Sequence, residues 1–322
     1  MASILDIFRA LADPTRLRII YLLRSMELAV GEIAQVVGQS QPRVSRHVRI
    51  LVEAGLAERR KEGSWVFLRL GQDAHIAPLT RFLDGAELSD SEALWMKADL
   101  ARLAAVRNDR AQAAEHYFAE HAGEWDAIRS LHVPEAEVEA AMQAMLGSRG
   151  IGRLLDVGTG TGRMLQLFGP SAAQVMAVDR SPEMLRFARV KLPEEGSGKY
   201  ELLLGDFYAL PLQDGASDTV IIHQVLHYAQ QPELVIREAA RVLDSHGRLL
   251  IADFAPHERE ELRSRDAHAR LGFSDDQIGR WFDQAGFEME DERTLAGELT
   301  VKLWLGRRRE AQVLPIKGRT AS

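Results

Sequence analysis

The chain contains no cysteine among its 322 residues. Disulfide bonds, thiolate-bound zinc, iron–sulfur clusters and a thiol nucleophile are therefore excluded, and the composition fits a reducing compartment such as the cytoplasm. Long apolar runs are missing as well, so we expect neither a membrane span nor a membrane partner. The opening residues MASILDIF lack a basic segment and include Asp6, so we expect no secretory signal peptide.

Charges of the two signs are unevenly distributed. Residues 1–72 hold 11 Lys and Arg against 7 Asp and Glu, a net charge of +4, although the whole chain carries −7. A basic first segment joined to an acidic remainder suggests a polyanion as the partner of the first segment. Local fluctuation of a solvated surface would give the same count. With 46% hydrophobic residues, a chain of this length suggests two packed domains.

The basic first segment has the pattern of short helices joined by tight turns. Asp13-Pro14 predicts a helix start, with the aspartate as N-cap and the proline in the first turn. Val30–Val37 predicts a second helix that ends at Gly38, and residues 40–42 (Ser-Gln-Pro) predict the start of a third. Two short helices around a glycine turn are typical of a helix-turn-helix.

The third of these helices separates an apolar stripe from a basic face. Val44, Val48 and Leu51, with Val52, share one side at helical spacing. Arg43, Arg46 and His47 project from the other side, and arginine suits both guanine edges and phosphates in the major groove. The alternative for this helix taken alone is an ordinary solvated face.

A strand–turn–strand pattern follows in residues 56–70, with a polar turn at Gly63, and predicts a β-hairpin wing. Its rising arm carries a basic run, where phosphate contacts are expected. Together the helix and the wing favour DNA binding. The predicted DNA-binding residues are Ser40, Gln41, Arg43, Arg46, His47, Arg59, Arg60 and Lys61.

Residues 11–19 (LADPTRLRI), 41–47 (QPRVSRH) and 51–56 (LVEAGL) resemble the ArsR-type winged-helix repressors, and the resemblance covers residues 5–72. It implies a homodimer that binds a double-stranded DNA operator and leaves it when an effector binds. Many such repressors sense metals through a cysteine pair on the helix that leads into the helix-turn-helix. The corresponding residues 27–33 hold no cysteine. Thiolate metal sensing is excluded there, and we assign no metal site.

The middle of the chain predicts a long helix. Residues 73–115 are rich in Ala, Leu, Glu and Arg, and residues 89–92 (Ser-Asp-Ser-Glu) resemble a helix start. This helix is either a plain connection or part of a dimer interface. Aromatic residues including Tyr117 and Trp125 come next. They either pack a helix or form a lid over a ligand.

A glycine-rich turn opens the second domain. A short apolar strand over residues 152–157 runs into Gly158, Gly160 and Gly162, and a helix follows. This is the start of a doubly wound sheet, in which a ligand approaches the backbone at a helix N-terminus. A dinucleotide fingerprint requires glycine at position 163, which is Arg. Asp156 before the turn would repel a pyrophosphate and attract a cationic amino-acid group. Both facts favour S-adenosylmethionine or S-adenosylhomocysteine over a nicotinamide cofactor.

Further strands follow at regular intervals. The second strand ends at Asp179, whose carboxylate suits ribose hydroxyls. The third strand ends at residues 205–207, where Asp206 and Phe207 suit adenine. The fourth strand runs into His223. A fifth strand over residues 247–253, a helix and a closing hairpin complete the pattern. The predicted cofactor-binding residues are Asp156, Gly158, Gly160, Gly162, Asp179, Arg180, Asp206, Phe207, His223, Tyr117 and Trp125.

Residues 156–162, 178–179, 205–206 and 241–249 resemble the motifs of class I S-adenosylmethionine-dependent methyltransferases, of the small-molecule type seen in quinone biosynthesis. The resemblance covers residues 115–306. It implies a Rossmann-like sheet of seven strands with the last antiparallel, and it places His223 and Gln224 where the fourth strand opens on the methyl group. Methyl transfer needs in-line approach and loss of water more than an acid–base pair, so we assign no catalytic residue.

The sequence thus predicts a multidomain α+β and α/β protein. Its parts are a winged helix-turn-helix (residues 1–84), a linker or dimerisation helix (85–115), a methyltransferase domain (116–306) and a flexible tail (307–322). One hypothesis is a cytoplasmic transcriptional regulator that senses the methionine cycle through an S-adenosyl ligand. The other is an active methyltransferase for a small-molecule acceptor, with the winged helix serving autoregulation.

Overall fold

The computed structural model describes residues 3–26, 28–62, 65–71, 75–121, 135–147, 149–192 and 199–309, without the side chains of residues 60–62, 65, 107–121 and 264. The chain divides into two compact units. Unit 1 comprises Met1–Tyr117 and Glu258–Leu271, and unit 2 comprises Phe118–His257 and Gly272–Ser322. Across these described ranges, no helix combines the length and the hydropathy that a membrane crossing requires.

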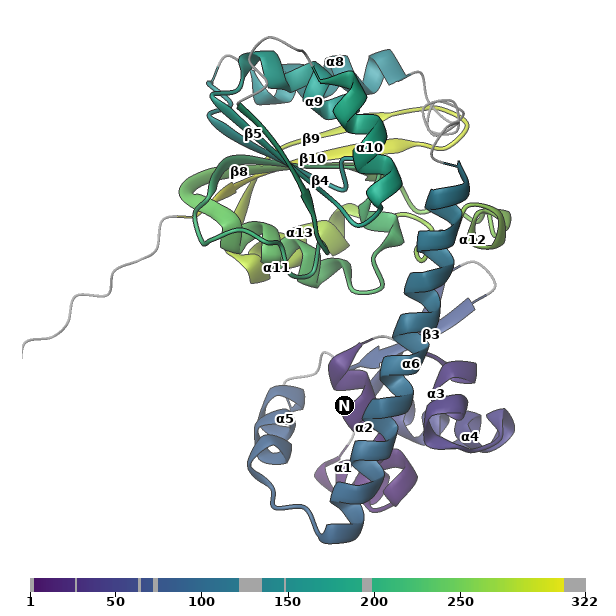
Figure 1. Ribbon diagram of the computed structural model, residues 1–322. Helices are drawn as coiled ribbons and strands as arrows, with labels where there is room; N and C mark the ends of the chain where they lie inside the picture. Colours follow the sequence, from purple (N-terminus) through teal and green to yellow (C-terminus); the bar gives the residue numbers. More distant parts are fainter. Residues whose placement is uncertain are drawn as a thin grey trace, which may run out of the picture. The chain divides into compact units, whose positions relative to one another are not determined.

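Unit 1 begins with the predicted winged helix (Figure 1). Asp13 caps the second helix, because its Oδ1 accepts the N–H of Arg16 at 3.0 Å, and Gly38 ends the third in the left-handed region with φ +69°. The three strands pair in the order β1-β3-β2. The elements are α1 (Ile4–Leu11), α2 (Pro14–Ser25), β1 (Leu28–Ala29), α3 (Val30–Val37), α4 (Gln41–Glu53), β2 (Ala57–Glu62) and β3 (Trp65–Leu70).

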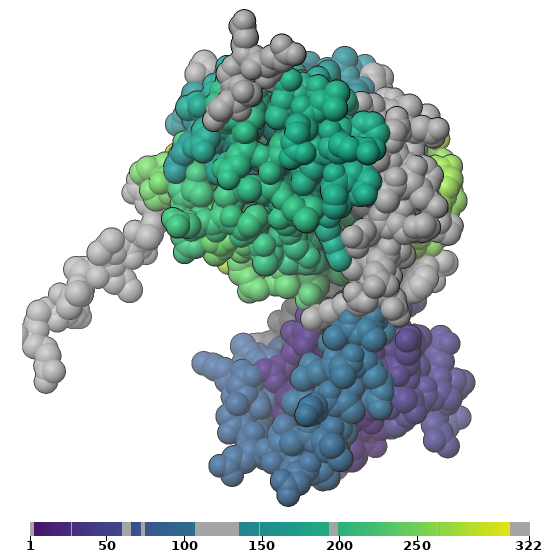
Figure 2. Space-filling view, viewed as in Figure 1, coloured from purple at the N-terminus to yellow at the C-terminus, as the bar shows by residue number. Residues whose placement is uncertain are grey.

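Two further helices complete this part of unit 1, α5 (Ile76–Gly85) and α6 (Asp90–His121). Ser89 and Glu92 cap α6 reciprocally, as the sequence predicts: the Ser89 N–H donates to Glu92 Oε2 at 2.9 Å. Helix α6 is continuous over 32 residues, and its Leu103 and Val106 are buried in the core of unit 1. The helix predicted as a linker is therefore also a core element. Figure 2 shows atoms of α5 and the first half of α6, in blue, on the visible face of unit 1.

A buried ionic network attaches α6 to the helix-turn-helix. Asp99 is 3% exposed and accepts two hydrogen bonds from Arg18 of α2, both at 2.6 Å. Arg102 shares the same carboxylate at 3.1 Å. The two guanidiniums also donate to the last carbonyls of α3, Arg18 to Val37 at 2.9 Å and Arg102 to Val36 at 3.1 Å. The end of α3, just before the turn to α4, is thus held by α2 and α6.

A segment from late in the chain also belongs to unit 1, which no sequence pattern predicts. Glu258–Leu271 contains the short helix α12 (Glu261–Arg265). The guanidinium carbons of Arg263 and Arg270 lie 5.5 and 5.2 Å from the ring centroid of Phe67 on β3, which is within the range of cation–π contacts. Both ends of this segment continue into unit 2.

Unit 2 is built on a seven-stranded sheet with the order β6-β5-β4-β7-β8-β10-β9. The five strands β6, β5, β4, β7 and β8 are parallel to one another, and β10 is antiparallel to both of its neighbours, β8 and β9. This confirms the predicted Rossmann-like sheet with an antiparallel last strand. The strands are β4 (Arg153–Val157), β5 (Gln174–Asp179), β6 (Tyr200–Leu204), β7 (Ser217–His223), β8 (Leu243–Phe254), β9 (Phe287–Leu295) and β10 (Val301–Arg308).

Helices cover both faces of this sheet, with α8, α9 and α10 on one face and α11 and α13 on the other (Figure 1). Strands buried on two faces need continuous apolar runs, and Val175–Val178 of β5 is such a run. The helices are α8 (Glu135–Leu146), α9 (Arg163–Phe168), α10 (Pro182–Lys191), α11 (Pro232–Val242) and α13 (Asp275–Ala285). Short 3₁₀ turns lie at Gly169–Ser171 and Leu226–Tyr228.

The prediction of a flexible tail from residue 307 is wrong at its start. Arg307 and Arg308 belong to β10, where Arg307 pairs with Glu288 of β9 and with Arg248 of β8. The Arg307 guanidinium also lies 3.4 Å from the Glu288 carboxylate. The sequence pattern does not reveal this pairing, because the cross-strand partners of Arg307 and Arg308 lie far away in the sequence. Residues 310–322 fall outside the described part of the chain.

Candidate functional site

Parallel strands end side by side at one edge of the unit 2 sheet. β4 lies between β5 and β7, and β6 follows β5. The chain runs from β4 outward to β5 and β6, then returns to the other side of β4 with β7 and β8, so the strand order reverses beside β4. Ligands of open α/β sheets bind outside the carboxyl ends of the strands at such a point.

The glycine turn after β4 is shaped for close backbone approach. Gly158, Gly160 and Gly162 have φ of +71°, +53° and +84°, a region that residues with a Cβ rarely adopt. A Cβ on Gly158 would also lie 2.6 Å from Cγ1 of Val225. The N–H of Gly158 donates to the carbonyl of Val178 at 2.8 Å, which holds the turn over the end of β5.

Asp179, the last residue of β5, is bound to this turn. Its Oδ2 accepts the N–H of Gly160 at 2.7 Å, and its Oδ1 accepts the N–H of Ser181 at 2.9 Å. Burial raises the pKa of Asp179, and hydrogen bonds from the backbone of Ser181, Gly160 and Arg180 act in the opposite direction. An ionised carboxylate accepts about four hydrogen bonds, so Asp179 keeps acceptor capacity for a ligand hydroxyl.

Two further buried polar groups lie at the start of the turn. Asp156, one residue before the end of β4, is 1% exposed. Thr159 is 5% exposed, and its Oγ1 has no hydrogen-bond partner within the described residues. A buried hydroxyl without a partner is costly, so it fits a position that a polar ligand completes. The glycine cradle, the Asp179 acceptor and this hydroxyl together fit an S-adenosyl group.

The residues predicted to hold adenine follow β6. Asp206 Oδ1 accepts the N–H of Tyr208 at 2.9 Å, which fixes the turn. Phe207 contacts the edge of Tyr208 with ring centroids 4.7 Å apart. Both Asp206 and Phe207 are half-buried, whereas Arg180 after β5 is exposed. Asp156, Asp179 and Asp206 therefore come from the ends of three neighbouring parallel strands.

The end of β7 is strained at a residue that the resemblance placed near the methyl group. His223 is the last residue of β7 and is 7% exposed. Gln224 follows with φ +52°, and its N–H donates to the carbonyl of Ala252 at 2.7 Å. A non-glycine residue in this region costs about 1–3 kcal/mol, and such residues concentrate at functional sites.

A buried His–Asp pair beside this strand end was missed from the sequence. The ring Nδ1 of His227 lies 2.8 Å from Asp253 Oδ1, and the backbone N–H of His227 donates to Oδ2 at 3.1 Å. The side chains are 2% and 0% exposed. The sequence does show Asp253 near the end of the apolar strand β8. It does not show that His227 is its partner, because the two residues are 26 positions apart.

Arg163, whose presence argued against a dinucleotide site, has a structural partner. Its guanidinium forms two hydrogen bonds with Glu139 of α8, at 2.5 and 2.7 Å. This pair attaches α8 to the first residue of α9. The predicted lid residues Tyr117 and Trp125 lie outside the described part: Tyr117 is in α6 without a described side chain, and Trp125 is not described.

In unit 1, helix α4 presents the predicted reading face. Val44, Val48 and Leu51 are buried, whereas Arg43 and Arg46 are exposed. Ser40 and Gln41 at the N-terminal end are exposed as well. His47 lies differently, because its ring is half-buried with Nδ1 3.6 Å from Oδ1 of Asp13, the α2 N-cap. The structure therefore brings Arg43 and Arg46 to the surface and directs His47 toward α2.

The wing hairpin pairs as its alternation predicts. Arg59 of β2 lies opposite Leu68 and is exposed, and Glu58 bonds Arg69 across the hairpin at 2.8 Å. Arg60 and Lys61 are in β2, but their side chains fall outside the description.

Two family models match the chain, one in each unit. Residues 13–59 match the model described as bacterial regulatory protein, arsR family. Residues 155–251 match the model described as methyltransferase domain. The first range covers α2 to the start of β2, and the second runs from β4 into β8.

Known proteins resemble each unit separately. The arsenical resistance operon repressor of Escherichia coli (strain K12) is 46% identical over 67 residues, which are 20% of this chain and 57% of the repressor. The arsenic resistance transcriptional regulator ArsR1 of Pseudomonas putida is 36% identical over 101 residues, which are 30% of this chain and 75% of that regulator.

Among solved structures, a chain from the complex of the Haloferax volcanii Trm112 methyltransferase activator with a methyltransferase matches with a TM-score of 0.51. The match has 19% identity and covers 60% of this chain and 98% of that chain, so it supports the fold alone. For three curated methyltransferases, from Mycobacterium tuberculosis, Bacillus subtilis and Legionella pneumophila, this chain spans 37, 42 and 51% of their length.

Proposed function

Because the chain belongs to the ArsR family of bacterial regulatory proteins and carries a class I methyltransferase domain, we propose that it is an S-adenosyl-responsive transcriptional regulator. In this proposal unit 1 binds a double-stranded DNA operator. Unit 2 binds S-adenosylmethionine or S-adenosylhomocysteine, and the bound ligand changes the operator affinity. The methionine cycle interconverts these two compounds, so the protein would sense the state of that cycle from the cytoplasm.

The observation that carries the proposal is the attachment of Asp179 to the glycine turn. The carboxylate is held by the N–H groups of Gly160 and Ser181, in a turn whose positive φ angles exclude side chains. A pre-positioned acceptor beside a glycine turn that carries no side chain at three positions suits a nucleoside, because ribose hydroxyls donate and adenine needs close approach. Asp156 supplies negative charge near the same strand ends, which suits the amino-acid group of the ligand.

S-adenosylmethionine supplies an electrophilic methyl group on a sulfonium when it is bound. The residues of this chain would bind and orient it: the glycine turn admits it, Asp179 takes the ribose, and Asp206 and Phe207 take the adenine. The strand ends at His223 and Gln224 would border the methyl group and exclude water. None of these roles needs a proton transfer, and none is assigned.

The DNA half of the proposal rests on α4 and the wing. Exposed Arg43 and Arg46 project from a helix whose other side is buried, and this arrangement suits insertion into a major groove. Arg59 on the wing would contact phosphate, together with Arg60 and Lys61. Ser40 and Gln41 at the helix N-terminus suit a phosphate as well.

A route for coupling is supported by the late segment of unit 1. Glu258–Leu271 leaves the end of β8 and returns before α13, and its Arg263 and Arg270 cover Phe67 on the wing strand β3. A ligand that binds at the strand ends of unit 2 would bias this segment, and the segment would bias the wing. The effect is limited by the difference in ligand affinity between the two states.

The proposal includes a homodimer, which exposed apolar side chains support. Ile4, Leu5 and Phe8 of α1 are 61–68% exposed, and Phe82 of α5 and Leu94 of α6 are 70 and 72% exposed. Apolar surface of this kind on a soluble domain commonly marks an interface. A second copy would cover these helices and present two reading helices to the two halves of an operator.

An active methyltransferase is the second candidate, and the His227–Asp253 pair favours it. Both residues are buried beside the carboxyl ends of β7 and β8, where a methyl acceptor would approach. The paired carboxylate would hold the imidazole in one orientation. The acceptor would be a small molecule, and the winged helix would then serve autoregulation.

One pair of assays tests both candidates on the full chain. Operator affinity is measured by fluorescence anisotropy with S-adenosylmethionine, S-adenosylhomocysteine or NAD, and methyl transfer from labelled donor is measured in cell extract. We expect S-adenosylmethionine and S-adenosylhomocysteine to change operator affinity to different extents, with the larger change about 5- to 150-fold, the usual range of allosteric coupling, and NAD to have no effect. Transfer without any change in operator affinity would favour the enzyme. No effect and no transfer would contradict both.

A further inference from the structure

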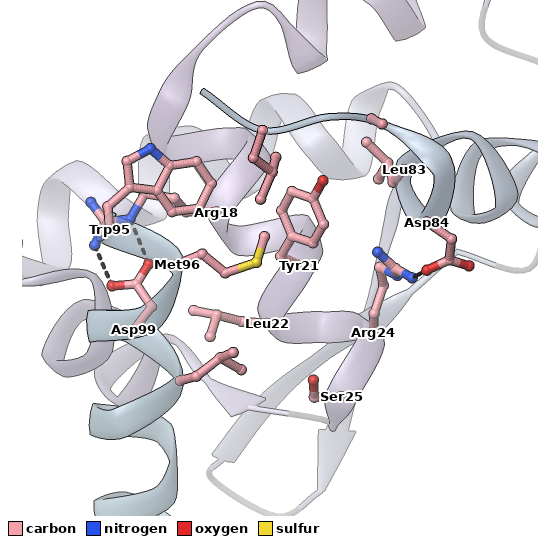
Figure 3. A pocket seen from close by; sticks show the side chains of 13 residues that line it. Arg18, Tyr21, Leu22, Arg24, Ser25, Leu83, Asp84, Trp95, Met96 and Asp99 are labelled. Carbon is pink, nitrogen blue, oxygen red and sulfur yellow. Dashed lines mark hydrogen bonds and ion pairs between the residues drawn. The ribbon is translucent and has the colours of Figure 1, made fainter. Parts of the chain in front are cut away.

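Unit 1 contains a cavity of about 460 Å³ that the functions above do not use. It lies between α2 and α6 and is closed on one side by the end of α5 and the residues after it. Figure 3 shows Trp95 and Met96 of α6 directed toward Tyr21 and Leu22 of α2. Cavities of this size hold small organic ligands in other proteins.

Apolar and aromatic groups supply most of the cavity wall. Leu22, Leu83 and Met96 provide apolar surface. The rings of Tyr21 and Trp95 lie 6.2 Å apart at 56°, so they contact each other at an angle and leave other ring surface toward the cavity. Such a wall favours a ligand with a flat apolar body.

Two ion pairs border the cavity, and they differ in how firmly they are held. Arg18 is fixed on Asp99, whose side chain is 4% exposed and is also held by Arg102. Arg24 pairs with Asp84 at the rim, where the Asp84 side chain is 63% exposed. An exposed ion pair contributes little free energy, so Arg24 can exchange Asp84 for a ligand carboxylate at small cost. Asp99 cannot be displaced in this way.

The charge of this network selects the sign of the ligand. The wall holds the guanidiniums of Arg18 and Arg24 and the carboxylates of Asp84 and Asp99. Arg102 lies outside the wall and shares the Asp99 carboxylate with Arg18, so the network as a whole has one more positive than negative group. Arg18 lies 5.8 Å from the Trp95 ring and Arg24 lies 5.4 Å from the Tyr21 ring, so these rings already have cations beside them. A cationic ligand would be repelled, and an anionic ligand would be attracted.

Tyr21 adds a neutral donor. Burial raises the pKa of its hydroxyl, and this keeps the proton in place at neutral pH. The hydroxyl can therefore donate to an anionic ligand in addition to Arg24.

We propose that this cavity is an effector site for a small organic anion, with a flat apolar body against Trp95 and Met96 and a carboxylate on Arg24. Its wall includes Arg18, which donates to the carbonyl of Val37 at the end of α3. A ligand that moves α2 against α6 therefore acts on the helix-turn-helix directly. The site is independent of the S-adenosyl site in unit 2 and adds a second input to the DNA-binding unit.

The test uses 1-naphthoate as probe, with 1-naphthamide and 1-naphthylmethylammonium as neutral and cationic analogues of the same shape. Binding to the full chain is measured by calorimetry, and operator affinity is measured with and without the probe. We expect saturable binding of naphthoate, binding of the amide weaker by about tenfold, and no binding of the cation. We also expect naphthoate to change operator affinity.

Substitutions locate the site. Arg24→Gln removes the carboxylate partner and should weaken naphthoate binding by about tenfold, whereas Arg81→Gln, an exposed arginine of α5 outside the cavity, should not. Tyr21→Phe should weaken binding less, because it removes one neutral donor. Thermal unfolding of each variant checks that the fold is kept.

Several results would overturn the proposal. These are equal binding of the carboxylate and the amide, equal naphthoate affinity in Arg24→Gln and Arg81→Gln, or no saturable binding up to about 1 mM, the weak limit for a specific ligand. Binding only after the protein is diluted to monomers would show that a second copy fills the cavity. Binding that leaves operator affinity unchanged would refute the effector role.

Discussion

At the scale of single residues, the proposed ligand site depends most on Asp179. Its carboxylate is fixed by two backbone N–H groups and is the acceptor assigned to the ribose. We expect Asp179→Ala to weaken S-adenosylhomocysteine binding by about 1.5–3 kcal/mol, the range for a hydrogen bond to a charged group. Calorimetry on the full chain measures this. Asp276→Ala, an exposed aspartate of α13, is the matched control and should leave the affinity unchanged. Equal affinities in the two variants would remove the ribose role.

The titration of Asp179 predicts the pH dependence of ligand binding. Burial raises its pKa above the usual 3.8, so the folded state holds this proton more tightly than the unfolded chain does. The group therefore favours folding below its unfolded pKa, and that contribution is lost as the pH rises through the folded pKa. Ligand binding needs the ionised form and should weaken as the pH falls, with a midpoint above 3.8. Calorimetry across this range checks the expectation; an affinity independent of pH would contradict it.

Arg43 and Arg46 are the residues that we expect to contact the bases of the operator. Replacing either with alanine should weaken operator binding by about 1–3 kcal/mol if it contacts a base, and should leave S-adenosyl binding unchanged. Arg81→Ala removes the same charge from α5 and serves as control. Electrophoretic shift assays at fixed salt measure the effect. If both α4 variants bind like the control, α4 is not the reading helix.

Local residue patterns predicted where the glycines, the three aspartates and the two exposed arginines lie, because each position follows from a strand end or a helix face, whereas their binding roles stay predictions. His47 and Asp253 did not follow in this way. The orientation of His47 depends on Asp13, 34 residues earlier, and the pairing of Asp253 depends on the 3₁₀ turn after β7. Contacts between distant parts of the chain leave no periodic signal.

At the scale of elements, the glycine turn is set by backbone geometry. Gly158→Ala places a Cβ at φ +71° and 2.6 Å from Val225, so it should destabilise unit 2 by about 1–3 kcal/mol and weaken ligand binding. Gly279→Ala in α13 has no atom within 4 Å and should stabilise by about 0.5–1 kcal/mol. Denaturant unfolding distinguishes the two. If Gly158→Ala and Gly279→Ala change the free energy of unfolding by the same amount, the turn at Gly158 is not constrained.

Most elements could be predicted from apolar periodicity and caps. The helix from Pro14, the Gly38 stop, the wing and the strands of the sheet all appear where these signals lie. The ends were less predictable: β8 begins at Leu243 rather than near 247, and β10 continues through Arg308. Strand ends depend on the neighbouring strand, and Arg308 is held by Phe287 in β9. A single-strand pattern carries no information about that neighbour.

At the scale of the whole molecule, the charge division agrees with the two units. The basic first segment folds as the winged helix of unit 1, for which we propose DNA binding, and the proposed S-adenosyl site lies at the sheet of unit 2. The late segment Glu258–Leu271 could not have been placed from the sequence, because it looks like a surface insertion between a strand and a helix. Its contacts with Phe67 are made by a part of unit 1 from which the chain continues at both ends into unit 2.

The decisive measurement is the affinity of S-adenosylhomocysteine for the free full-length chain and for the same chain saturated with operator DNA. Thermodynamic linkage requires that the operator change this affinity by the same factor by which the ligand changes operator affinity. We expect equal factors of at least about fivefold in the intact chain and none in Asp179→Ala. An S-adenosylhomocysteine affinity that is the same with and without operator would show that the two units bind independently, and the chain would not be an S-adenosyl-responsive regulator.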